Sequence, residues 1–67
     1  MLYVLELFCG SEKRKLKAVT YQARSGDDAV RYAKTILKHE VIQDKRPDLC
    51  LVKYGNGELL SVVQRDA

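Results

Sequence analysis

The chain is poor in the residues from which active sites and metal centres are usually built. Its 67 residues include one histidine, two cysteines and no tryptophan. A structural zinc site of the usual kind needs four such ligands, so His39, Cys9 and Cys50 do not suffice for one. No acidic pair is placed as a general acid and base would be. The sequence therefore predicts a non-enzymatic protein with no catalytic, cofactor-binding or metal-binding residue.

Long apolar runs and a leader segment are also missing. The first apolar run is broken by Glu6, and none is long enough to cross a bilayer. Residues 1–3 do not begin a basic leader of the kind that a secretory signal peptide has. From these features and the low cysteine content we expect a cytoplasmic protein with reduced thiols and no membrane contact.

The residues that the chain does contain indicate a folded protein, with disorder expected only at the last two or three residues. Apolar residues make up 46% of the chain and charged residues 31%, with a single proline, which is the composition of a folded protein. The length allows one small domain, residues 1–67, which buries only about 60% of its unfolded surface. Such domains commonly need disulfides, metals or self-association for stability. Self-association is the supplement that this composition leaves.

Alternating apolar residues predict four strands, at residues 2–9, 15–24, 49–54 and 59–65. The first two strands are expected to form a hairpin. In that hairpin we place Leu7 opposite Val19 and Leu5 opposite Tyr21, so that all four side chains share a face.

The last two strands are joined by a strong turn signal. Residues 56 and 57 are Asn-Gly, a pair that suits the two positive-φ positions of a type I′ turn. A turn centred there pairs Tyr54 with Leu59, Val52 with Ser61 and Cys50 with Val63.

Between the hairpins the sequence predicts a helix. Ser25 is a suitable N-cap, and Asp28 lies three residues later like the acid of a capping box. Apolar residues then recur at spacings of three and four: Ala29, Val30, Ala33, Ile36, Leu37 and Val41. The helix is expected to end between His39 and Ile42.

The element order β-β-α-β-β indicates an α+β fold, with one helix packed on one face of a four-stranded, mainly antiparallel sheet. We expect the helix to cover the face that carries Tyr3, Leu5, Leu7, Val19, Tyr21, Cys50 and Val52. The opposite face is also apolar but is interrupted by Glu6, Lys53 and Gln64.

One helix cannot cover both faces of a sheet, so the second face is expected to meet another copy of the chain. A twofold homodimer is the commonest solution. The predicted dimer interface consists of Leu2, Val4, Phe8, Leu16, Leu49, Leu51, Leu60 and Val62. An adaptor domain that binds a different protein is an alternative. No motif in the chain identifies a biochemical role.

A basic cluster supports a second alternative, a nucleic-acid-binding module. Lys13, Arg14, Lys15 and Lys17 lie in or beside the first predicted loop, and the net charge of +3 permits contact with phosphates. The same charges are ordinary for a solvated loop, which is the simpler interpretation. If the helix covered the other face instead, three tyrosines would be exposed as a stacking platform for bases.

Overall fold

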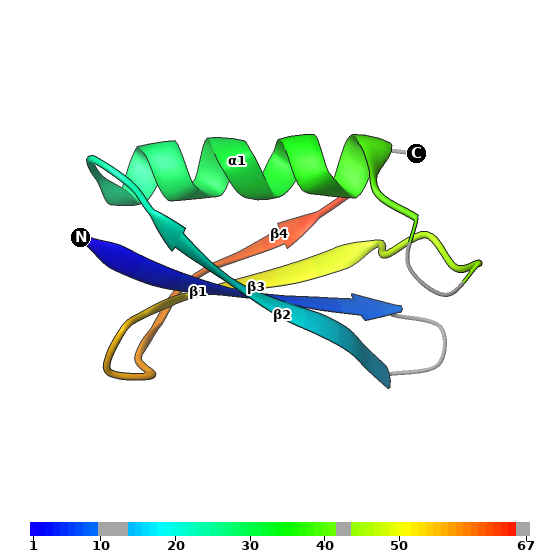
Figure 1. Cartoon of the computed structure of the whole chain (residues 1–67), viewed down its shortest axis with the longest axis horizontal. Coiled ribbons are helices and arrows are strands. Elements are labelled where there is room, and N and C mark those ends of the chain that lie inside the picture. Colours follow the sequence, from blue (N-terminus) through cyan, green and yellow to red (C-terminus); the bar gives the residue numbers. More distant parts are fainter. Residues whose placement is uncertain (10–13, 42–43, 66–67) are drawn as a thin grey trace.

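The computed structural model describes residues 1–9, 14–41 and 44–65 (Figure 1). Its elements are, in chain order, β1 (Leu2–Cys9), β2 (Arg14–Gln22), α1 (Gly26–His39), β3 (Leu49–Tyr54) and β4 (Leu59–Gln64). The predicted β-β-α-β-β order and the α+β class are confirmed.

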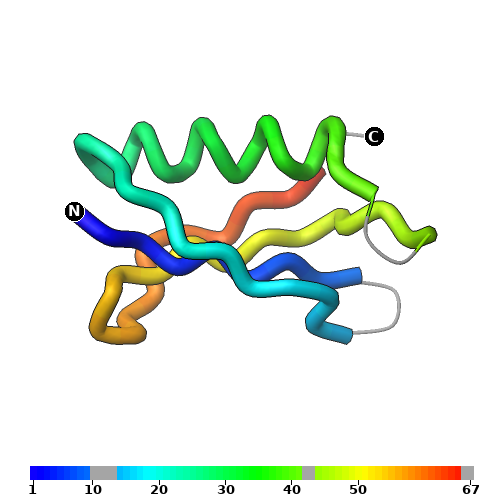
Figure 2. Tube along the Cα trace, viewed as in Figure 1, coloured from blue at the N-terminus to red at the C-terminus, as the bar shows by residue number. Residues whose placement is uncertain are grey.

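The four strands form one antiparallel sheet in the order β2-β1-β3-β4. β1 and β3 are therefore central, and β2 and β4 are the edges. α1 lies along one face of the sheet, and the end of β4 rises toward its C-terminal half (Figures 1 and 2). No other described element covers the opposite face of the sheet.

Capping fixes the start and the end of α1. The Ser25 hydroxyl accepts a hydrogen bond from the Asp28 amide at 3.3 Å, as expected of an N-cap. The Asp28 carboxylate accepts one at 3.3 Å from the amide of Arg24, one residue before the cap. At the other end the Glu40 amide donates to the Ile36 carbonyl and closes the last turn. Val41 lies beyond the helix and is 59% exposed, so its prediction as part of the apolar stripe was wrong.

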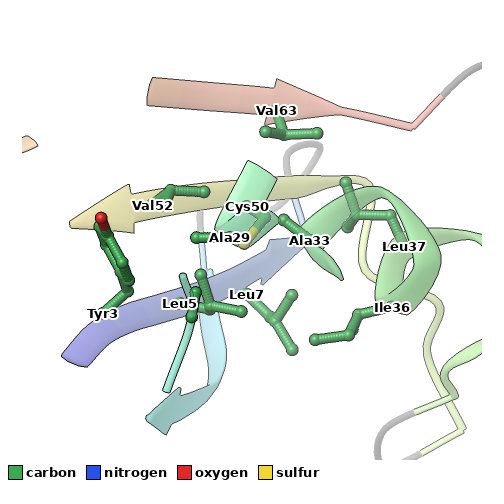
Figure 3. Close-up of a cluster of buried hydrophobic side chains, with 11 residues drawn as sticks. Tyr3, Leu5, Leu7, Ala29, Ala33, Ile36, Leu37, Cys50, Val52 and Val63 are labelled. Carbon is green, nitrogen blue, oxygen red and sulfur yellow. The ribbon is translucent and has the colours of Figure 1, made fainter. Parts of the chain in front are cut away.

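The core lies between α1 and the face that was expected to be covered (Figure 3). Tyr3, Leu5 and Leu7 of β1 are buried there together with Cys50 and Val52 of β3. The helix contributes buried side chains at Ala29, Ala33, Ile36 and Leu37. The small alanine side chains let the helix approach the sheet closely.

The first hairpin has the predicted faces but not the predicted register. Leu5 lies opposite Val19 and Tyr3 opposite Tyr21, which is a displacement of two residues from the prediction. Because strand side chains alternate with a period of two, a two-residue displacement leaves each side chain on its face. The apolar pattern therefore could not distinguish the two registers.

The second hairpin confirms two predicted pairs, Val52 with Ser61 and Cys50 with Val63. The pair Tyr54 with Leu59 was wrong, because the Tyr54 amide donates to the Glu58 carbonyl at 2.8 Å. The turn is also not type I′.

The actual turn is a three-residue loop. The Gly57 amide donates to the Tyr54 carbonyl at 2.9 Å, and Gly57 has a φ of 96°. Asn56 does not have the positive φ that a type I′ turn requires. A type I turn followed by a left-handed glycine is the usual three-residue hairpin connection, and a further register shift follows between Val52 and Lys53.

Candidate interaction surfaces

The uncovered face of the sheet is mainly apolar across its two central strands and is interrupted by one charged cluster. Across the two central strands, Phe8 lies opposite Leu49 and Glu6 opposite Leu51. Val62 of β4 lies beside Leu51. Six of the eight predicted interface residues lie on this face: Leu2, Val4, Phe8, Leu49, Leu51 and Val62. Leu2 and Val62 are the most open of them, at 49% and 50% exposed.

The two remaining predicted interface residues lie at irregularities of the sheet. Leu16 is half-buried at the shift in register between β1 and β2. Leu60 does not lie on the uncovered face, because it packs against the core beside Gly26. Its assignment to that face was wrong, since the register shift in the second hairpin reverses the alternation. Leu59 takes the outward position instead and is 54% exposed.

The polar interruption of this surface is an ion-paired cluster. The Glu6 carboxylate contacts the Lys53 ammonium at 2.7 Å and the Lys15 ammonium at 3.4 Å, and the Glu6 side chain is only 15% exposed. The hydrogen bond from Lys53 is the main cause that lowers the pKa of Glu6 below 4.5, and it outweighs the opposing effect of burial. The negative charge of Glu6 is therefore largely neutralised by lysines on the two neighbouring strands.

The predicted basic cluster is described in part. Arg14, Lys15 and Lys17 are exposed on β2, and Lys13 lies outside the described residues. Lys15 turns toward Glu6, as described above. Lys15 lies opposite Phe8 and therefore on the uncovered face, whereas Lys17 lies opposite Leu7 on the helix-side face.

The tyrosines that a nucleic-acid platform would use are on the helix side. Tyr3 is 2% exposed, and the ring of Tyr54 lies 5.8 Å from it. Tyr21 stacks on Tyr32 of α1 with ring centroids 4.0 Å apart. In the structure the helix covers the face that carries these rings, so the alternative arrangement that would expose them is not present.

The cysteines and the histidine form no described site. Cys50 is completely buried, which raises the pKa of its thiol to about 11, with a smaller effect of the Glu6 charge. Cys9 is half-buried and is not joined to Cys50. His39 is exposed in the last turn of α1, where a basic residue favours the helix end.

Within the described ranges no group of three or more metal-binding side chains is present. The described part of the chain has no helix long and apolar enough to cross a membrane.

A second surface lies on the helix side of the molecule. A cavity of about 360 Å³ is lined by Lys34, Leu37 and Lys38 of α1 and by Gln64 and Arg65 at the end of β4. Arg65 could not be predicted as part of a site, because only the sheet order places the end of β4 beside the helix. No local pattern in the sequence carried that information.

Comparisons with protein-family models, with curated proteins and with solved structures give no match. The two surfaces described above are therefore the basis for the proposed function.

Proposed function

We propose that the protein is a homodimeric interaction module in which the uncovered sheet face binds the same face of a second copy. The observation that carries this proposal is the mainly apolar surface opposite the helix, interrupted by the Glu6 cluster, with Leu2 and Val62 about half exposed near its margins. In a small domain such a surface marks an interaction site. A second copy supplies the same apolar surface and requires no other partner.

The size of the uncovered face limits the area that the dimer can bury. The molecule measures 30 × 19 × 17 Å, and Figure 1 is viewed along the shortest axis with the helix above the sheet. The uncovered face is therefore roughly 30 by 17 Å, or about 500 Å² per subunit, near the low end for specific interfaces. An interface of this size is expected to give a weak dimer that dissociates on dilution.

The charges of the face are compatible with its burial. The carboxylate of Glu6 already has two lysine partners within its own subunit. A buried acid without a partner would be strongly unfavourable, whereas a paired one costs much less. The cluster therefore permits contact between two faces and helps to fix their relative orientation.

Sedimentation equilibrium of a matched pair of variants tests the proposal. Val62→Asp places a charge on the uncovered face, whereas Val41→Asp places the same charge on an equally open valine beyond α1. We expect the wild type and Val41→Asp to dimerise with similar constants and Val62→Asp to sediment as a 7.6 kDa monomer. Circular dichroism verifies that all three are folded.

Two results would reject the dimer. One is a monomeric wild type at concentrations well above the micromolar range, and the other is equal weakening by both variants. A different protein that co-purifies in equal amount with the wild type but not with Val62→Asp would show an adaptor surface instead.

The exposed cations of β2 favour nucleic-acid binding as the second candidate function. Arg14 and Lys17 carry no acidic partner among the described residues. Binding of this kind weakens steeply with salt, and an Arg14→Gln/Lys17→Gln variant is expected to lose it. If wild-type retention on an oligonucleotide column is absent or independent of salt, this candidate is rejected.

A further inference from the structure

We propose that the cavity between α1 and the end of β4 is a binding site for a phosphate group carried by a small molecule. The site lies between α1 and the edge strand β4, and only Gln64 of its lining shares the uncovered face, so this inference does not depend on the proposed dimer. Three features support the site: the charge of the lining, an unsatisfied donor and the size of the cavity.

The lining of the cavity is positive. Lys34, Lys38 and Arg65 contribute three cations, and no acidic side chain lines it. None of the three has an acidic partner among the described residues. Lys34 and Lys38 are one helical turn apart, where two like charges repel each other. An anion bound between the two lysines would attract both ammonium groups and offset their mutual repulsion.

A fourth cation lies next to this group. The guanidinium of Arg46 donates to the main-chain carbonyl of Lys38 at 2.9 Å. This bond satisfies one of the free carbonyls at the end of α1. The negative end of the helix explains why Lys38 and Arg46 are favourable there. It does not explain the position of Arg65, which comes from the sheet.

Arg65 is the residue that points to a ligand. Its main-chain amide donates to the Asp48 carbonyl at 2.9 Å, which fixes the end of β4 beneath the helix. Its guanidinium Nη1 is buried and has no hydrogen-bond partner among the described residues. A buried donor on a charged group is unfavourable when it is unpaired. Arg65 also lines the cavity, so an anion bound there would be a partner for its guanidinium.

The remaining lining fits a phosphate ester. Arginine binds phosphate oxygens through two parallel hydrogen bonds, and lysines supply point charges on either side. The Gln64 amide adds a neutral donor, and Leu37 forms an apolar wall. The volume of about 360 Å³ is within the range of small-molecule sites and exceeds what a bare phosphate ion needs. The remainder would accept the organic part of the ligand.

Titration with inorganic phosphate, followed by chemical shifts of the backbone amides, tests the site. We expect saturable changes at the cavity residues and none at the start of β2. Arg65→Gln should weaken binding about ten-fold or more, as loss of a charge-assisted hydrogen bond does. Arg24→Gln makes the same charge change at an exposed residue before the helix and should alter the affinity less than two-fold.

Three outcomes would overturn the proposal. Shift changes spread over all lysines, or equal weakening by Arg65→Gln and Arg24→Gln, would show non-specific attraction. Changes centred on Arg14 and Lys17 would assign phosphate binding to the basic end of β2.

The dimer proposal and the phosphate-site proposal can be rejected independently of each other. Val62→Asp should abolish dimerisation without changing phosphate affinity, and Arg65→Gln should do the reverse. Circular dichroism of Arg65→Gln checks that the loss of phosphate binding is not a loss of fold.

Discussion

At the scale of single residues, the uncovered face is defined as much by one acid as by its apolar side chains. The carboxylate of Glu6 lies between the ammonium groups of Lys53 and Lys15, and its side chain is mostly buried. Alternation along β1 predicted the face on which Glu6 lies. It did not predict the ion pairs, because both lysines come from other strands and reach Glu6 only through the strand pairing.

The pKa of Glu6 leads to a prediction about acid stability. Because the pKa is lowered in the folded chain, the stability that Glu6 contributes is present above its ordinary value of 4.5 and is lost as the pH falls through the lower folded value. Glu6→Gln should therefore lower the free energy of unfolding by about 1 kcal/mol at neutral pH. It should make little difference in strong acid.

Urea unfolding across this pH range measures the effect. The Val62→Asp background keeps dimerisation out of the comparison, and Glu58→Gln, at an exposed acid of the second hairpin, is the control. An acid transition in Glu6→Gln as steep as that of the control would contradict the prediction.

Leucines 59 and 60 show where residue-level prediction stops. Two identical apolar residues in succession fit either alternation, so the sequence cannot say which one turns inward. The left-handed Gly57 and the register shift after it decide the matter, with Leu60 against the core and Leu59 outward.

At the scale of elements, the strands and the helix follow closely from local sequence. The expected bounds of β1 and β3 and the N-cap of α1 agree with the structure, α1 ends within its expected range, and β2 and β4 differ by one or two residues at their ends. Local signals succeed because caps and alternation act within a few residues. Registers were less predictable, because a two-residue displacement keeps every side chain on its face.

The N-cap of α1 provides a prediction at this scale. Ser25→Ala removes the acceptor for the Asp28 amide and should lower the free energy of unfolding by about 1 kcal/mol. Ser25→Asn keeps an acceptor at the same position and should remain within a few tenths of a kcal/mol of the wild type. Thermal and urea unfolding of both variants measure the difference. Equal losses in the two would mean that the cap contributes nothing.

At the scale of the whole molecule, the sheet order was not predictable. Composition and alternation give four strands and two faces, but they carry no information on which strands are neighbours. The order β2-β1-β3-β4 determines that Glu6 meets Lys53 and that Arg65 lies beside α1. Both candidate surfaces therefore depend on long-range pairing.

Hydrogen exchange tests whether the dimer joins faces or edges. In the proposed face-to-face dimer β2 remains an edge, so about every second amide of β2 should exchange fast, while amides of β1 and β3 exchange slowly. Measurements above and below the dimerisation concentration make the comparison. Uniform slowing along β2 on dimerisation would show that the copies join at that edge instead.

The central place of β1 also determines the order in which the chain folds as it is made. β2 is complete at Gln22, but β3, the second neighbour of β1, begins only at Leu49, an interval that a ribosome needs roughly 1–5 s to synthesise. A hairpin forms in about 1–10 μs. An isolated two-stranded hairpin is at best marginally stable in water, so the inner edge of β1 stays open to pairing with other chains until β3 occupies it.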